Sequence, residues 1–210
     1  ENGIKVAHVI ANTKFALKAQ DAGVDAIVAE GFEAGGHNGR EETTTLTLIP
    51  MIRKATNLPL IAAGGIATGR GMLAAFCLGA DAVQIGSRFV ASHESSAHIN
   101  FKNEVLKTSE GGTRLSMKKL VPVRLIKNKF ADDIDKAESE GKSSEFLKEI
   151  LGNRRAKLGM FEGDMEEGEL EIGQVASLID EIKPAQEIVN EILSEYRSAK
   201  ENLASAEYEF

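Results

Sequence analysis

The sequence has a single cysteine and no long apolar run, and each shortage excludes a class of protein. Cys77 is the only cysteine among 210 residues. An internal disulfide and a cysteine metal cluster are therefore excluded, and a reducing cytoplasm is the expected compartment. No apolar run approaches the roughly 20 residues that a membrane-spanning helix needs. We therefore expect no membrane insertion.

Basic charge is also scarce. The chain has 25 lysines and arginines against 32 acidic residues, a net charge of -7. Nucleic-acid binding is disfavoured, because neutralising phosphates needs a basic surface. No set of residues has the spacing of metal ligands, so no metal site is expected. A 42% hydrophobic content is ordinary for a protein that folds around an apolar core.

Short apolar segments alternate with segments of helical periodicity over the first ninety residues. Each apolar segment has the length and β-branched content of a buried strand. Strict β/α alternation predicts a parallel sheet. The predicted strands are 4–10, 24–29, 60–63 and 82–85, and the predicted helices are 13–22, 46–56 and 71–78.

The sequence contains an internal repeat, since AGVDAI at 22–27 recurs as LGADAV at 78–83. In each copy a glycine ends a helix and an aspartate precedes a strand. We interpret Asp25 and Asp81 as structural residues that bond backbone N–H groups. A repeat of about two β/α units favours a barrel.

Four strands are half the number that a TIM (β/α)8 barrel needs. We therefore predict an α/β fold in which residues 1–91 are the last four β/α units, the C-terminal half of such a barrel. An open doubly wound sheet is the alternative. The chain begins at Glu1, close to a predicted strand, so we expect it to be part of a longer protein.

From about Ser92 the pattern changes to helices and loops without clear strands, which predicts a helical cap over residues 92–210. The last helix follows Pro184, a residue typical of a helix start. Apolar residues at helical spacing predict a packing face on it: Ile188, Ile192, Tyr196, Ala199 and Leu203.

Three glycine-rich segments each follow a predicted strand, where a parallel barrel places its active-site loops. The first, EGFEAGGHNG at 30–39, presents a single imidazole among four glycines. Unshielded imidazole exchanges protons near neutral pH. His37 is therefore the candidate acid-base residue, while His8, His93 and His98 are interpreted as structural or surface groups.

The other two segments indicate an anion site. AAGGIATGRG at 62–71 leads from a strand through a glycine turn into a helix, which offers backbone N–H groups and a helix N-terminus. QIGSRF at 84–89 adds a hydroxyl from Ser87 and the guanidinium of Arg88. Together they predict the phosphate site that barrels form after their last two strands.

These three segments resemble the nitronate monooxygenase and enoyl-acyl-carrier-protein reductase II family, with the bacterial reductase II branch the more similar. The resemblance covers nearly the whole chain and includes the segment ELEIGQVA at 169–176. It implies an FMN enzyme with His37 as the active-site histidine. The implied cofactor-binding residues are Glu30, Gly35, Gly36, Ala63, Gly64, Gly65, Gln84, Gly86 and Ser87.

Two positions depart from the family pattern. Glu30 stands where some members have glutamine, and a carboxylate there suits a monovalent cation. Ser87 stands where many members have threonine, and it keeps the hydroxyl donor. The implied reaction is reduction of an enoyl thioester of fatty-acid synthesis with NADH or NADPH. The alternative is oxidation of an alkyl nitronate by dioxygen, with His37 as base or anion partner.

One basic stretch favours the reductase. Residues 111–131 contain no acidic residue, although the chain as a whole has a net charge of -7. Acyl carrier proteins are acidic, and a complementary surface speeds encounter. The other interpretation is internal pairing, with the acidic run at 162–171 among the partners. The predicted docking residues are Arg114, Lys118, Lys119, Arg124, Lys127 and Lys129.

Two further alternatives stay open from the sequence. In the first, the chain by itself would be an inactive fragment that cannot hold flavin, since four strands leave two sheet edges open. A second copy or the missing half would then complete the barrel, so a homodimer is one expectation. In the second, the chain belongs to another phosphate-binding barrel, such as an isomerase or a nucleotide dehydrogenase.

Overall fold

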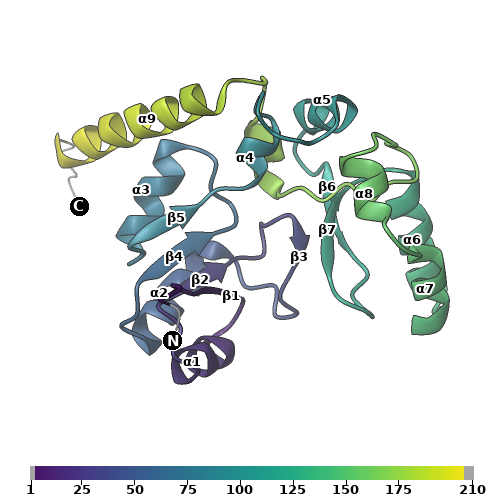
Figure 1. The fold of residues 1–210 in the computed structure, drawn as a ribbon, viewed down its shortest axis with the longest axis horizontal. Coiled ribbons are helices and arrows are strands. Elements are labelled where there is room, and N and C mark those ends of the chain that lie inside the picture. The colour runs from purple at the N-terminus through teal and green to yellow at the C-terminus, as the bar shows by residue number, and fades with distance from the viewer. Residues whose placement is uncertain (1–2, 206–210) are drawn as a thin grey trace, which may run out of the picture.

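The computed structural model describes residues 3–205 and places them in two connected units (Figure 1). The first unit is a parallel sheet with helices, and the second is a small antiparallel sheet with helices. The strands β1, β2, β4 and β5 form the parallel sheet in that order, and β3, β7 and β6 form the antiparallel sheet. The long helix α9 returns to the first unit and lies across α3 (Figure 1).

The elements of the first unit follow the predicted alternation closely. They are β1 (Ala7–Ile10), α1 (Thr13–Asp21), β2 (Ala26–Glu30), α2 (Thr45–Ala55), β4 (Leu60–Ala63), α3 (Gly69–Cys77), β5 (Ala82–Gln84) and α4 (Ser87–Val90).

The core of this unit lies between the sheet and its helices. Ile27 of β2 and Leu60 of β4 are fully buried against Leu48, Ile49 and Ile52 of α2. The central strands β2 and β4 are buried, whereas β1 and β5 form the two edges and are mostly exposed. Unpaired strand edges of this kind are templates for further pairing.

Both aspartates of the internal repeat hold neighbouring strands in register, as predicted. Asp25 accepts a hydrogen bond of 2.8 Å from the Val6 N–H, immediately before β1. Asp81 accepts one of 2.8 Å from the Leu60 N–H at the start of β4. The two copies of the repeat therefore make the same strand-to-strand contact, and the structural interpretation is confirmed.

The second unit corrects the expectation that no strands follow Ser92. β6 (Thr113–Ser116) and β7 (Val123–Ile126) form an antiparallel pair, to which β3 (Gly36–His37) adds a third strand. The strands were missed because β7 is buried along its whole length, yet Arg124 interrupts the continuous apolar run that identifies a buried strand. The remaining elements are α5 (Ile99–Lys107), α6 (Lys129–Ser139), α7 (Ser144–Leu151), α8 (Arg155–Met160), the 3-10 helix η1 (Gln174–Leu178) and α9 (Ala185–Ser205).

The packing face of α9 is formed by its first part. Ile188 is fully buried and Ile192 nearly so, and the ring of Tyr196 contacts Phe76 edge-on at 5.6 Å between centroids. Leu203 is 49% exposed, which corrects the end of the predicted stripe. Among residues 3–205, no helix is long and apolar enough to cross a membrane.

Candidate active site

A cleft lies at the carboxyl ends of β2, β4 and β5. Its walls include the last residue of each of these strands, namely Glu30, Ala63 and Gln84. The cleft has a volume of about 210 Å³. It occupies the edge of a parallel sheet where barrel enzymes place their active sites. All three glycine-rich segments therefore contribute backbone or side chains to one site, as predicted.

Two glycines at the cleft, Gly35 and Gly64, are required by close backbone approach. Gly64 has φ +83°, and a Cβ there would lie 2.7 Å from the Gly31 carbonyl oxygen. A Cβ on Gly35 would lie 2.4 Å from the Ile172 carbonyl carbon. A Cβ on Gly86, by contrast, would meet nothing within 4 Å. The backbone is thus tightly packed behind the cleft and open toward it at Gly86.

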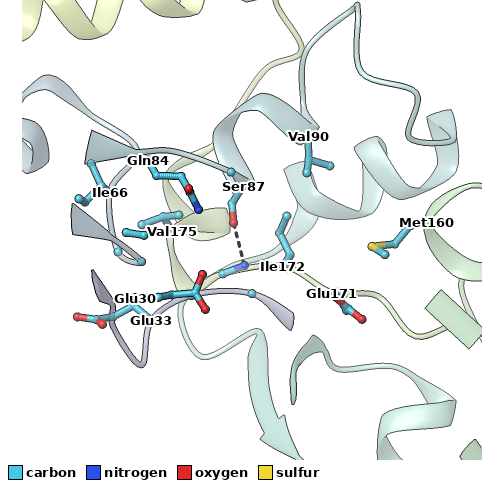
Figure 2. Close-up of a pocket in the computed structure, with 17 residues that line it drawn as sticks. Glu30, Glu33, Ile66, Gln84, Ser87, Val90, Met160, Glu171, Ile172 and Val175 are labelled. Atoms are coloured by element: carbon cyan, nitrogen blue, oxygen red, sulfur yellow. Dashed lines mark hydrogen bonds between the residues drawn. The ribbon is translucent and has the colours of Figure 1, made fainter. Parts of the chain in front are cut away.

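Ser87 connects the barrel side of the cleft to the second unit. Its Oγ accepts a hydrogen bond of 2.9 Å from the Gly173 N–H (Figure 2). Since a hydroxyl that accepts a bond keeps its own proton, Ser87 retains a donor for a ligand. Gln84, Ser87 and Glu30 lie around the same space in Figure 2. These three side chains are the polar groups that a bound cofactor would meet first.

Three carboxyl groups line the cleft, from Glu30, Glu33 and Glu171. Glu33 serves the fold, because it accepts bonds of 2.9 Å and 3.0 Å from the Thr45 N–H and hydroxyl at the start of α2. Burial raises the pKa of Glu30. Burial also raises the pKa of Glu171, and the nearby His37 opposes this shift. No lysine, arginine or histidine of the described chain is among the cleft-lining residues.

The side chain of His37 lies outside this cleft, although Glu33, Ala34 and Gly35 of the same segment line it. This corrects the expectation that the first segment directs its imidazole into the shared pocket. His37 is exposed and lines an adjoining hollow of about 360 Å³, together with Val123, Leu151 and Glu169. The reason is backbone pairing, since Gly36 and His37 pair with Arg124 and Val123 of β7. This pairing directs the histidine to the second unit. Gly36 is buried but does not line the cleft either.

Two of the expected anion-binding groups point elsewhere. Arg88 is 8% exposed, and its Nη1 donates to the Glu181 carbonyl oxygen rather than facing the cleft. At the start of α3, the Gly69 N–H donates to the Glu195 carboxylate and the Gly71 N–H to the Thr68 hydroxyl. The N-terminus of α3 is therefore bonded within the protein, because α9 packs directly onto it.

The segment before η1 supplies cleft residues that the sequence did not assign to the site. The segment at 169–176 was noted for its resemblance alone, and its contacts with the cleft depend on the chain returning from the second unit. These cleft residues are Met160 of α8, Glu171, Ile172 and Gly173 of the return segment, and Val175 of η1.

The predicted docking residues do not form one free basic surface. Arg124 is only 2% exposed, donates to the Phe32 carbonyl oxygen and lies 4.4 Å from the Phe32 ring centroid. It is therefore a core residue, which corrects its inclusion. Most of the others contact acidic groups or backbone: Arg114 with Asp132 and Asp135, Lys118 with Glu42, Lys129 with Glu167 and Asp133, and the Lys119 Nζ with the Lys142 carbonyl oxygen, while Lys127 is exposed.

The other histidines and the cysteine show no part in the cleft. The His98 Nδ1 accepts a bond of 3.1 Å from the Asn100 N–H at the start of α5. His98 is thus a helix cap, as the structural interpretation required. Cys77 is a free, exposed thiol at the end of α3.

Comparison with known proteins identifies the family. The model of the nitronate monooxygenase family matches residues 1–195. A probable nitronate monooxygenase of Staphylococcus aureus is 32% identical over 206 residues, which are 93% of this chain and 57% of that protein. The chain therefore spans a little over half the length of this curated relative.

Two solved structures share the fold at higher or similar identity. FabK from Thermotoga maritima is 44% identical with a TM-score of 0.91, over 97% of this chain and 64% of that one. A nitroalkane oxidase from Streptomyces ansochromogenes is 29% identical with a TM-score of 0.77, over 96% of this chain and 60% of that one. The α/β fold and its correspondence to part of a TIM barrel are thereby confirmed. The chain belongs to the nitronate monooxygenase family, whose members are flavin-dependent oxidoreductases.

Proposed function

We propose that the protein containing this chain is an FMN-dependent enoyl-acyl-carrier-protein reductase that uses NADH or NADPH. The observation that carries the proposal is the mainly apolar hollow beside the cleft. Its wall carries His37 together with Met117, Leu120, Val121 and Val123. Such a hollow suits the acyl chain of an enoyl thioester, which a small alkyl nitronate lacks.

Sequence similarity supports the same choice. Identity is 44% to FabK, an enoyl-acyl-carrier-protein reductase II, against 32% to the Staphylococcus aureus relative and 29% to the nitroalkane oxidase. The similarities cover comparable shares of this chain. The reductase branch is therefore the nearer of these three.

The cleft fits the phosphate end of a flavin nucleotide. Its wall contains the Gly64-Gly65 turn, the open backbone at Gly86 and the Ser87 hydroxyl. Backbone N–H groups and a hydroxyl are suitable donors to phosphate oxygens. The raised pKa of Glu30 reduces the repulsion that a fully ionised carboxylate would exert. We propose that these residues hold the phosphate and that Gly35 allows close approach of the ring.

When bound, FMN would supply hydride transfer from the nicotinamide to the β-carbon of the enoyl thioester. The chain's own part would be to hold the substrate carbonyl and to deliver a proton to the α-carbon. His37 is the proposed proton donor, since it lies beside the cleft on the wall of the adjoining hollow. The hollow would receive the acyl substrate, because apolar side chains such as Met117, Leu120 and Val121 line it.

Three further assignments belong to the same proposal. An acyl carrier protein is the proposed donor of the substrate, and a homodimer is the proposed assembly. Glu30 would also provide a carboxylate ligand if a monovalent cation binds at the cleft. Replacing potassium by tetramethylammonium in the assay should then lower the rate, and an unchanged rate would remove the cation from the proposal.

The described chain alone should hold FMN weakly. The cleft volume of about 210 Å³ is below the roughly 300–1,000 Å³ typical of ligand sites. The two edges of the sheet, β1 and β5, are also exposed. After gel filtration, the purified 210-residue chain should show no flavin absorbance bands. Persistent bands would show that these residues suffice.

The alternative function is nitronate oxidation, which the names of the curated relative and of the Streptomyces structure favour. The deciding experiment uses the flavin-loaded enzyme with two assays. We expect nicotinamide-dependent reduction of an enoyl thioester and little oxygen uptake on an alkyl nitronate. Rapid oxygen uptake without nicotinamide, together with no thioester reduction, would overturn the reductase proposal.

A further inference from the structure

An imidazole and two carboxyl groups follow one edge of β7, between the cleft and the hollow. On this edge β3 pairs His37 with Val123. The return segment continues the pairing through a bridge between Glu171 and Leu125. Because side chains alternate along a strand, the partners of Val123 and Leu125 lie on the same face of the sheet, roughly 7 Å apart. His37 and Glu171 are therefore neighbours on that face.

Glu171 packs directly against the strand that carries His37. A Cβ on Gly36 would lie 2.5 Å from the Glu171 Oε2. The missing side chain at Gly36 therefore makes room for this carboxyl group. Glu171 reaches the cleft wall, where Figure 2 shows it on the same side as Met160. It thus contacts both the cleft and the strand of the candidate acid-base residue.

Glu169 extends this arrangement toward the hollow. It lies two residues before Glu171, is 7% exposed and lines the hollow together with His37. Burial and the charge of Glu171 raise the pKa of Glu169 to about 7. Each group therefore acts on the next, since His37 lowers the pKa of Glu171 and Glu171 raises that of Glu169.

We propose that Glu171 is the positioning residue of His37, and that Glu169 completes a chain of three groups that stores and returns the imidazole proton. This inference rests on the proposed function, in which His37 protonates the substrate. One proton would leave the imidazolium for the α-carbon. The carboxyl pair would then return one proton to the imidazole, and solvent in the hollow would restore it to the pair. Only protons move in this sequence.

The two ends of this series of three groups face surroundings of different charge. The charged side chains on the wall of the hollow are mainly basic, and those on the wall of the cleft are acidic. Arg155 of α8 lowers the pKa of Glu169 but does not outweigh burial. The charged groups that must stay unchanged in any test are Lys148, Arg154 and Arg155 on the hollow wall, Glu30 and Glu33 on the cleft wall, and Arg124 of β7.

Coupling is tested without turnover by carboxyl carbon NMR titration of the flavin-loaded enzyme. Glu171→Gln should lower the pKa of Glu169 from about 7, because it removes the neighbouring charge. His37→Asn should raise the pKa of Glu171, because it removes the opposing cation. Glu166→Gln is the matched control, since Glu166 is exposed in the same part of the chain. A Glu169 titration that Glu171→Gln leaves unchanged would overturn the chain of groups.

Positioning is tested by separate measurement of kcat and KM for enoyl thioester reduction. Glu171→Gln should reduce kcat roughly tenfold, because the imidazole loses the group that orients it. KM should stay within about twofold. A normal kcat in Glu171→Gln, with His37→Ala nearly inactive, would overturn the positioning role alone. If the unmodified enzyme reduces no thioester, the proposed function fails, and the NMR titrations still decide whether the three groups are coupled.

Discussion

The Ser87 hydroxyl accepts a hydrogen bond of 2.9 Å from the Gly173 N–H, across 86 residues of sequence. Ser87 begins α4 directly after the last strand of the parallel sheet, while Gly173 lies in the segment that returns from the second unit. A Cβ on Gly173 would lie 2.9 Å from both the Ser87 Oγ and the Glu33 carbonyl oxygen. This contact therefore joins the two units at the cleft wall.

Replacing Ser87 tests the contact and the proposed phosphate donor together. Ser87→Ala removes the acceptor for the Gly173 N–H and the donor to the ligand. Only the bond to the ligand changes the affinity directly, and at about 0.5–1.5 kcal/mol its loss should weaken FMN binding roughly two- to tenfold. Ser87→Thr keeps the hydroxyl and should bind FMN normally. Flavin fluorescence titration of the full-length protein measures both, and equal affinity in all three proteins would contradict the assignment.

Gly64 should not tolerate a side chain, for a reason separate from its backbone angle. Gly64→Ala adds a Cβ 2.7 Å from the Gly31 carbonyl oxygen, whereas Gly23 has nearly the same φ, +81° against +83°, with no neighbour within 4 Å. Gly23→Ala therefore carries the strain alone, at about 1 kcal/mol. In the full-length protein, we expect Gly64→Ala to lose FMN binding and Gly23→Ala to keep it. Equal retention of flavin would show that the turn is not part of the site.

His37→Ala should lower turnover by roughly 10²–10⁴-fold, the range typical of a lost general acid or base. The effect should appear in kcat at saturating substrate. His93→Ala is the matched control, because His93 is likewise exposed but lies outside both the cleft and the hollow. A His37→Ala enzyme with normal turnover would remove the acid-base role.

Glu169 should make stability depend on pH between about 4.5 and 7. Its folded pKa is about 7 against an ordinary 4.5, so the folded state binds more protons than the unfolded state in this window. Stability is then greatest below pH 4.5 and falls as pH rises to about 7, by about 3 kcal/mol for a shift of this size. Glu169→Gln should flatten this fall. Urea unfolding at pH 5 and pH 8 measures it, and an equal fall in both proteins would contradict the burial effect.

Docking of an acidic carrier protein should depend on the exposed lysines alone. Lys119→Glu with Lys127→Glu should raise KM for a carrier-bound enoyl substrate at low salt and leave KM for a small thioester unchanged. Arg124 is unsuitable for this test because it is a core residue. Equal effects on both substrates would reject carrier docking on this surface.

Local patterns predicted the parallel sheet well. Apolar segments separated by amphipathic helices determine both the strands and their order, and the repeated aspartates hold adjacent strands in register at Val6 and Leu60. The glycine turn at 64–65 and the Gly86-Ser87 pair were also found from sequence, because each follows a strand directly. Parallel strands bring such loops to one edge without further information.

The placement of His37 was not predictable in the same way. The sequence shows a histidine among glycines after a strand, but its direction depends on pairing with β7, about 86 residues later. Arg124 gave the same difficulty, since a basic residue in a basic stretch suggests a surface. Its burial depends on contacts with Phe32, a residue of the other unit.

The sequence by itself determined the α/β fold, the structural aspartates and the glycine loops of the cleft, because each depends on residues near one another in the chain. Only the tertiary structure decided that Glu171 and Gly173 complete the cleft and that His37 stands beside it. Those positions depend on long-range strand pairing between two units, and no local preference of the residues involved encodes that pairing.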